Sequence, residues 1–210
     1  MDLSLILTLA VIHLAGLISP GPDLALVLNN SHSLSRKAAL LSAFGIALGV
    51  LAHAVLAITG ISILIANYPM LHSALQLISI GYLLWLGQGA IRGFLQSRTQ
   101  NQQIQGTASN DLWSAFAKGF LTNLLNPKAV IYFVSLIAAL IPTDITPLTQ
   151  SILITELFLL TFVWFGGLAW FLSLPRVQKK MLQATPWLNL TTGGVFILAA
   201  GVIATQALVS

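Results

Sequence analysis

Two prolines, a glycine and a carboxylate interrupt the first apolar stretch of the chain, in the sequence Ser19-Pro20-Gly21-Pro22-Asp23. A proline inside a helix removes a backbone donor and crowds the carbonyl four residues earlier, so Pro20 and Pro22 predict a break in the helix. An unwound backbone carries free polar groups, which a membrane tolerates only inside protein or along a watery cavity. Because a carboxylate at the same depth marks a functional site, we predict that this break lines a path or a binding site.

A second break is predicted in a later apolar stretch, at Asn126-Pro127-Lys128. Pro22 and Pro127 are 105 residues apart, and the same offset places Asp23 opposite Lys128. Interrupted helices at corresponding positions of two halves are the best sequence pointer to the binding site of a transporter. We therefore expect one site, with Asp23 and Lys128 as its charges and with these residues as its helix breakers: Pro20, Gly21, Pro22 and Pro127.

The two charges suit a zwitterionic ligand, whose desolvation needs a partner for each of its own charges. Asp23 can accept an ammonium group, whereas Lys128 and the free amides of a half-helix that starts near Pro127 can bind a carboxylate. Asn123 and Asn126 are three residues apart on one helical face, where their amides can bind the ligand without changing the net charge. The alternative is that Asp23 and Lys128 pair with each other and only neutralise the core.

Three more ionisable residues lie inside apolar stretches. Glu156 is a candidate for proton coupling beside Asp23, because a carboxyl group in a medium of low dielectric constant can take up and release protons near neutral pH. The alternative is a protonated Glu156 that is hydrogen-bonded to a neighbouring threonine or to another helix. His13 and His53 are candidates for a proton relay, although a single histidine in a membrane is more often a packing residue.

Several classes of function are disfavoured by what the sequence lacks. It contains no cysteine, which removes disulfides, thiolate metal sites and thiol redox relays. The histidines, at positions 13, 32, 53 and 72, lack the spacing of a metal site, so we expect neither a metal nor another cofactor. No nucleophile elbow, phosphate-binding loop or paired-carboxylate motif argues for an enzyme. Membrane topology explains the net charge of +4, which implies no nucleic-acid partner.

The composition places these residues in a lipid bilayer. Apolar residues make up 57% of the 210 residues and only 7% are charged, which is far from the composition of soluble domains. Counting stretches of about 20 apolar residues predicts an all-α integral membrane protein with six transmembrane helices. We expect helices 1 and 4 to be broken, and the six to lie at residues 3–30, 38–66, 69–91, 113–141, 146–174 and 187–209.

The polar segment 94–112 divides the chain into two groups of three helices, at residues 1–93 and 113–210. Because three is an odd number, the second group enters the membrane from the opposite side, so any repeat must be inverted. Eight of the nine lysines and arginines lie at odd-numbered loops. Positive charge marks the cytoplasmic side, which predicts that the 94–112 linker is cytoplasmic and that both termini are periplasmic.

Gly45 and Gly49, together with Ala52, form a face of small residues on the second expected helix. Such a face lets a neighbouring helix approach closely. Packing within the subunit is the simpler use of this face, and packing in a homodimer is the alternative.

Four motifs, spread over nearly the whole chain, carry a family resemblance. They are Ser19-Pro20-Gly21-Pro22-Asp23, Arg36-Lys37-Ala38, Gly81-Tyr82-Leu83 and the run from Gly119 to Ala129 that contains Asn126-Pro127-Lys128. Together they resemble the LysE/RhtB amino-acid exporters. The continuation Val130-Ile131-Tyr132-Phe133 and the pair Thr155-Glu156 make the chain most similar to the threonine and homoserine efflux branch. The resemblance implies a multi-pass exporter of small amino acids in the bacterial inner membrane, with protons as the coupling ion.

A second class of function stays open beside coupled export. The chain could be a passive channel or a membrane scaffold without coupled transport. A scaffold gains nothing from costly charges inside the membrane, which favours transport over a structural role. Flux that saturates with substrate and depends on a pH gradient would distinguish a carrier from a channel.

Overall fold

The computed structural model describes residues 3–19, 21–33, 35–61, 69–96, 111–142, 145–172 and 174–209, and every regular element within these ranges is a helix. In chain order they are α1 (Leu3–Ile18), α2 (Pro22–Ser33), α3 (Arg36–Val55), the π-helix η1 (Leu56–Ile61), α5 (Pro69–Gln96), α6 (Leu112–Leu124), α7 (Pro127–Leu140), α8 (Pro147–Phe171) and α9 (Pro175–Val209). Pro20, residues 97–110 of the expected linker, and the side chains of His32 and His72 lie outside the described part of the chain.

Polar caps fix where four of the helices begin. The side chains of Ser35, Asp111, Asn126 and Thr146 each accept a hydrogen bond from a first-turn amide of α3, α6, α7 and α8 respectively. A proline in the first turn of α7 and of α8 costs nothing there, because its missing N–H would have had no helical partner. These caps satisfy amides that the start of a helix would otherwise leave unpaired.

Both predicted breaks are present. α1 and α2 meet at an angle of 60°, and α6 and α7 meet at an angle of 53°. Backbone hydrogen bonding in α1 reaches the amide of Ser19, which donates to Ala15, and it starts again where the amide of Ala25 donates to Gly21. The prolines have no N–H to bridge the gap, so the chain changes direction at the residues where the sequence predicted it.

Helix length and composition identify a membrane protein. Among the described residues, Arg36–Gly60, Pro147–Phe171 and Gln183–Thr205 are each long and apolar enough to cross a membrane. The two bent helix pairs raise the number of candidate membrane crossings from three to five if each pair is one crossing. α5, the helix expected at residues 69–91, has 28 residues but is not among these candidates. Six crossings in two inverted repeats therefore stay a prediction.

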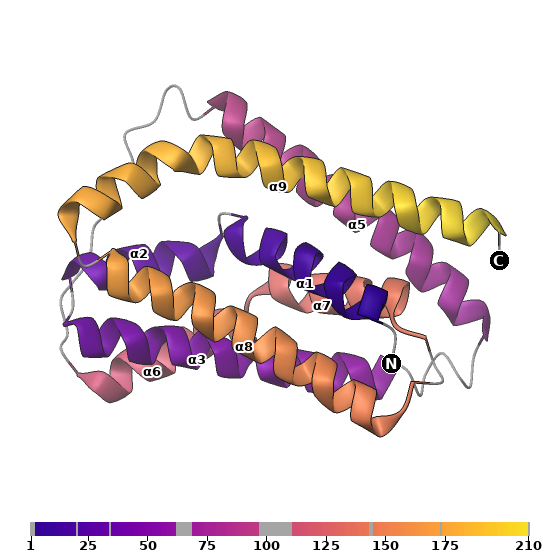
Figure 1. The fold of residues 1–210 in the computed structure, drawn as a ribbon, viewed down its shortest axis with the longest axis horizontal. Coiled ribbons are helices and arrows are strands. Elements are labelled where there is room, and N and C mark those ends of the chain that lie inside the picture. Colours follow the sequence, from indigo (N-terminus) through magenta and orange to yellow (C-terminus); the bar gives the residue numbers. More distant parts are fainter. Residues whose placement is uncertain are drawn as a thin grey trace.

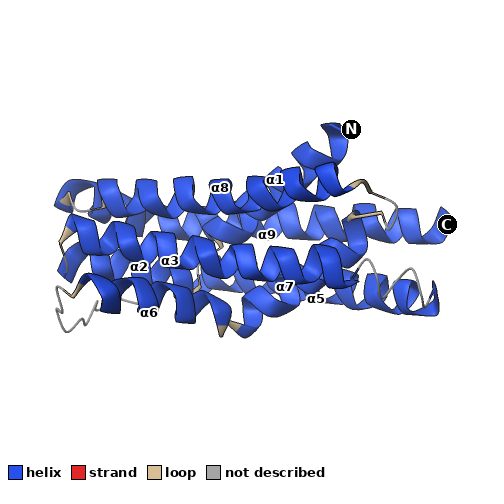
Figure 2. Cartoon of the chain, turned by 90° about the horizontal axis from the view of Figure 1, so that it is seen from below, coloured by secondary structure: helices blue, strands red, loops and turns tan. Residues whose placement is uncertain are grey.

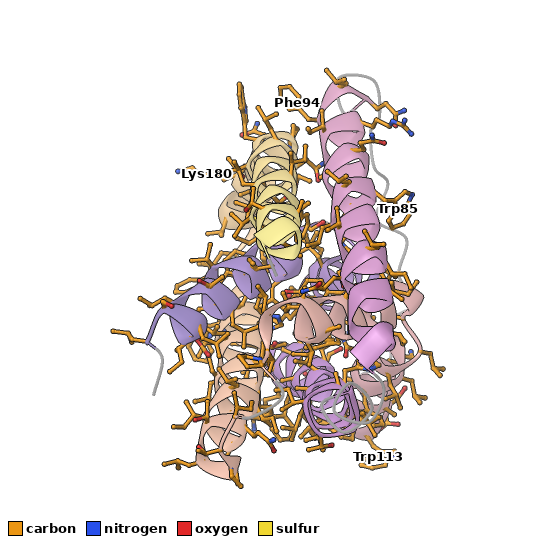
Figure 3. All side chains as sticks on the ribbon, turned by 90° about the vertical axis from the view of Figure 1, so that its right-hand side faces the viewer. Trp85, Phe94, Trp113 and Lys180 are labelled. Carbon is orange, nitrogen blue, oxygen red and sulfur yellow. The ribbon has the colours of Figure 1, made fainter. Side chains whose placement is uncertain are left out.

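The outer surface of the bundle is apolar. Leu77, Val163 and Leu198 are 69%, 69% and 72% exposed. Figure 3 shows Trp85 and Trp113 pointing away from the helices that carry them. Water disfavours so much exposed apolar surface, whereas the hydrocarbon of a bilayer accepts it. This surface therefore faces lipid.

Both ends of the described chain lie at the same end of the bundle (Figures 1 and 2). Figures 1 and 2 show the N and C marks at the same end of an elongated bundle. The end of α5 and the starts of α3, α6 and α9, which carry most of the basic residues, lie at the other end (Figure 1). An even number of crossings produces this arrangement. The assignment of the basic end to the cytoplasm stays a prediction from charge.

One expected connection is helical instead. Residues 175–186 were expected to join helices five and six, but α9 begins at Pro175 and runs for 35 residues with Pro186 inside it. The segment contains two glutamines, two lysines, one leucine and one methionine, which are strong helix formers. The basic residues Arg176, Lys179 and Lys180 consequently lie in the first turns of a helix rather than in a loop.

Two apolar cores fill the bundle. The termini-side core includes Leu9, Val50, Leu83, Phe133, Leu157 and Phe196. The opposite core includes Leu17, Leu28, Ala43, Ile46, Phe165 and Leu172. α3 and α8 contribute buried residues to both cores, whereas α7 contributes to the first and α2 to the second. Two continuous helices therefore run alongside two broken ones.

α3 and α6 are in contact through glycines. A Cβ atom at Gly119 would overlap the carbonyl oxygen of Ser42, and a Cβ atom at Gly45 would lie 2.7 Å from the amide nitrogen of Phe120. The face of small residues on α3 thus packs against α6 of the same chain, which accounts for that face without a second copy.

Gly119→Ala is expected to lower the free energy of unfolding by about 1–3 kcal/mol, because the added methyl group meets the backbone of α3. Thermal unfolding of the purified protein in detergent measures this loss. Gly167→Ala is the matched control, since, apart from its chain neighbours and its own helix backbone, no described residue lies within 4 Å of a Cβ atom there. Alanine favours a helix over glycine by about 1 kcal/mol, so the control is expected to be neutral or stabilising. Equal effects of both substitutions would contradict the close α3–α6 contact.

Candidate functional site

The two breaks meet around one cavity. It is lined by the end of α1, the start of α2 and the α6–α7 break, with apolar side chains from α3 and α8, and its space outside protein atoms is about 480 Å³ including the open mouth. Apolar lining residues come from both cores, so the cavity lies between them. All four residues that the sequence predicted to bind a ligand line this cavity, and its polar side chains are His13, Ser19, Asp23, Asn123, Asn126, Lys128 and Tyr132.

Asp23 is held in place from the other broken helix. It lies in the first turn of α2, where the free amides and the helix dipole favour a negative charge. Its Oδ2 atom accepts a hydrogen bond of 2.9 Å from Nδ2 of Asn123. Its Oδ1 atom is buried and has no hydrogen-bond partner among the described residues. Asp23 therefore keeps one oxygen for a ligand.

Asn123, at the end of α6, is fixed by α3. Nε2 of His53 lies 3.3 Å from the carbonyl oxygen of Asn123. A Cβ atom at Gly49 would lie 2.6 Å from Oδ1 of Asn123, so the glycine makes room for this amide. The ring of His53 also stacks on Phe133, with the two ring centroids 5.7 Å apart. In this structure His53 positions the second break, and its part in a proton relay stays a prediction.

Asn126 caps a helix, a role that its spacing from Asn123 did not predict. Its Oδ1 atom accepts a hydrogen bond of 3.0 Å from the backbone amide of Lys128, which makes Asn126 the cap of α7. The cap orients the positive end of the α7 dipole at the cavity. The position directly before Pro127 was the signal for a cap, because proline favours the first turn of a helix.

The ammonium group of Lys128 reaches across the cavity to the first break. Nζ donates hydrogen bonds to Oγ of Ser19 at 2.9 Å and to the carbonyl oxygen of Ser19 at 3.3 Å. It thereby satisfies a carbonyl next to the unwound segment. The backbone of Lys128 is held in turn, because its carbonyl oxygen accepts a hydrogen bond of 2.8 Å from the hydroxyl group of Tyr82. Sequence reasoning named Ser19 as part of the motif but assigned it no partner, since the contact spans 109 residues.

Asp23 and Lys128 line the same cavity with charges that attract each other. Each is also hydrogen-bonded to the other broken helix, Asp23 to Asn123 and Lys128 to Ser19. The arrangement is compatible with mutual neutralisation of the two charges and with a zwitterion bound between them.

The structure separates the two remaining candidates for proton coupling. His13 lines the cavity, and its Nε2 atom lies 2.9 Å from Oγ1 of Thr161. Glu156 lies instead beside a separate hollow on α8, next to Ser151 and Thr155, and its Oε2 atom is buried without a hydrogen-bond partner among the described residues. The hydroxyl group of Thr155 donates to the carbonyl of Ser151 rather than to Glu156. Glu156 is thus not brought together with Asp23.

Tyr132 is a cavity residue that sequence reasoning missed. It follows Lys128 by four residues on α7, which places both residues on one face of the helix. That spacing was the available signal. The hydroxyl group of Tyr132 is buried and has no hydrogen-bond partner among the described residues.

Known proteins resemble the chain along most of its length. The family described as LysE type translocator matches residues 14–207. The threonine efflux protein of Escherichia coli (strain K12) is 30% identical over 194 residues, which cover 92% of this chain and 94% of that protein. An uncharacterized membrane protein of Haemophilus influenzae is 28% identical, with 92% of each chain covered. YrhP, an uncharacterized membrane protein of Bacillus subtilis, is 30% identical over 82% of this chain and 86% of its own. No solved structure matches the chain.

Asp23→Asn and Lys128→Met are each expected to lower the free energy of unfolding, because each leaves a partly buried charge without its counter-charge. The double variant is expected to lose about 0.5–3 kcal/mol less than the sum of the two single losses. Thermal unfolding in detergent measures all three. Lys180, exposed at the surface of the bundle (Figure 3), supplies the control, since Lys180→Met should not couple to Asp23→Asn. Strictly additive losses for Asp23 and Lys128 would rule out their mutual stabilisation.

Proposed function

Because this chain belongs to the family of LysE-type translocators, we propose that it is a secondary transporter that exports small amino acids across the bacterial inner membrane by proton antiport. A substrate similar to threonine or homoserine is supported by relatives that are named threonine efflux proteins. The proposal assigns transport rather than catalysis to the site.

The observation that carries the proposal is the meeting of Asp23 and Lys128, from the two breaks, around one cavity. An amino acid loses its hydration when it enters such a cavity, and only a site with both charges compensates both ends of the zwitterion. Oδ1 of Asp23 is the partner for the ammonium group. The ammonium group of Lys128, with the positive end of the α7 dipole, is the partner for the carboxylate.

Proton antiport would follow from competition at Asp23. A proton and a substrate ammonium group both neutralise the same carboxylate, so each favours the departure of the other. Release of the amino acid outside would let Asp23 take up a proton there and lose it inside, where the next amino acid binds. Glu156 is the second candidate for this coupling, and its place outside the cavity would make it act on the helix α8 rather than on the substrate.

The arrangement of helices proposed for this transport is six crossings in two inverted repeats, residues 1–93 and 113–210. The two bent helix pairs support it, and so do the chain ends at one end of the bundle (Figure 1). Movement of the half-helices about their breaks would open the cavity to one side and then to the other. Both termini would be periplasmic and the 94–112 linker cytoplasmic.

The alternative function is a passive channel. The apolar cores on both sides of the cavity argue against a continuous aqueous pore in this conformation. Export from preloaded cells decides between the two, because a carrier saturates with substrate and responds to a pH gradient. A panel of amino acids, tested with and without the protein, identifies the substrate in the same experiment.

Asp23→Asn is expected to reduce proton-driven export by at least about tenfold, because it keeps the shape and the polarity of the side chain while removing the charge. Efflux of the preloaded amino acid at a fixed pH gradient measures this effect, at matched amounts of inserted protein. Near-normal export by this variant would refute the assignment of Asp23 as the ammonium partner.

Glu156→Gln is the matched comparison for the same assay. If Glu156 couples protons, this variant loses gradient-driven export and keeps exchange of labelled for unlabelled amino acid, whereas Asp23→Asn loses both. Unchanged gradient-driven export by Glu156→Gln would leave Asp23 as the sole carboxylate of the pair that couples protons.

Reporter fusions are expected to place both termini in the periplasm and the 94–112 linker in the cytoplasm, because the basic residues lie at the end of the bundle opposite to the termini. Fusions of alkaline phosphatase, which is active only in the periplasm, at the linker and at the C-terminus measure this. A linker fusion with high phosphatase activity would reverse the orientation.

A further inference from the structure

Beside its two charged residues, the cavity contains a second pair of polar side chains, His13 and Tyr132. His13 is 1% exposed and Tyr132 is 6% exposed, both side chains line the cavity, and their ring centroids are 6.1 Å apart. Nδ1 of His13 and the hydroxyl group of Tyr132 are both buried without a hydrogen-bond partner among the described residues. Buried polar atoms are rarely left in this state, because each forfeits its hydrogen bonds to water.

The hydrogen bonds around His13 determine what its free nitrogen can do. The hydroxyl group of Thr161 donates to the carbonyl oxygen of Leu157 at 2.7 Å. Its single proton is thus committed, so Oγ1 of Thr161 accepts from Nε2 of His13 at 2.9 Å. A neutral imidazole with its proton on Nε2 presents Nδ1 as an acceptor. His13 therefore offers an acceptor that only a hydrogen-bond donor can satisfy.

Tyr132 complements this acceptor. Its phenolic hydroxyl can donate a hydrogen bond, and no described residue receives one. Gly16 allows the phenol to lie against α1, because a Cβ atom at that position would lie 3.1 Å from Cζ and 3.2 Å from the hydroxyl oxygen of Tyr132. One acceptor and one donor, beside the charged residues of the same cavity, match a group that can both donate and accept.

We propose that His13 and Tyr132 form the subsite for the side-chain hydroxyl group of the substrate and make the transporter selective for hydroxy amino acids. The substrate hydroxyl donates to Nδ1 of His13 and accepts from the hydroxyl of Tyr132. An amino acid of the same shape with a methyl group in place of the hydroxyl leaves both polar atoms unpaired. This inference rests on the proposed function, because it concerns the third point at which the exported zwitterion is held.

The test compares each hydroxy amino acid with its hydrocarbon isostere in proteoliposomes. Threonine is paired with valine, serine with 2-aminobutyrate, and homoserine with norvaline, each as a competitor of the transported labelled substrate. The wild-type protein is expected to bind the hydroxy member of each pair with an affinity at least about tenfold higher than that for its isostere. Tyr132→Phe is expected to reduce that preference about tenfold by weakening the hydroxy member, while the affinity for the isostere stays the same.

Ser135→Ala is the matched control for Tyr132→Phe. Ser135 lies on the same helix, its hydroxyl group is also buried without a partner, and it does not line the cavity. This variant is expected to keep the wild-type preference. A loss of preference in both variants, or an equal loss of affinity for both members of a pair in Tyr132→Phe, would overturn the subsite.

The result for the wild-type protein does not depend on how any variant folds. If it transports amino acids but binds the isosteres as tightly as the hydroxy members, the subsite is refuted and the proposed export stands. If it transports no amino acid of the panel, the proposed function fails and the subsite fails with it.

Discussion

The breaks in the two bent helices depend on charges that reach from one to the other. Lys128 of α7 donates to the carbonyl and the hydroxyl of Ser19, and Asn123 of α6 donates to Asp23 of α2. These contacts are crossed, since each broken helix supplies a charge that the other one satisfies. In an apolar medium an unpaired charge or carbonyl costs several kcal/mol, so neither break is stable without the other. The cavity exists because both breaks stand at the same place.

The rest of the bundle holds the breaks at that place. α3 and α8 run unbroken past the cavity and contribute to the cores on both sides of it. Glycines on α3 let α6 come close enough for Gly49 to lie against the amide of Asn123, and this amide in turn orients Asp23. The position of the carboxylate thus follows from the packing of helices that carry no charge at the cavity. A polar site binds its ligand only if its side chains are held in place. Close packing of the surrounding apolar residues holds them.

Sequence reasoning found the features that depend on local chemistry. Proline cannot continue a helix, so the breaks at Pro22 and Pro127 could be read directly, and the rarity of membrane charges pointed to Asp23 and Lys128. Contacts between distant segments could not be read in this way. Thr161 lies 148 residues from its partner His13, and nothing in either segment specifies the other. Glu156 carried the same compositional signal as Asp23, yet packing placed it beside another hollow. A rare residue indicates a role but not a location.

Both cores contain residues of α3 and α8, so the two cores unfold cooperatively. A core formed from its own helices alone could melt while the other persisted, and the protein would behave as two foldons. Here any local opening that frees α3 or α8 from one core also loosens its contacts in the other. Sub-global opening is therefore easier for helices whose buried residues belong to one core, as those of the half-helices α2 and α7 do. The same division lets the short segments reorient while the amide protons of the long ones stay protected from solvent exchange.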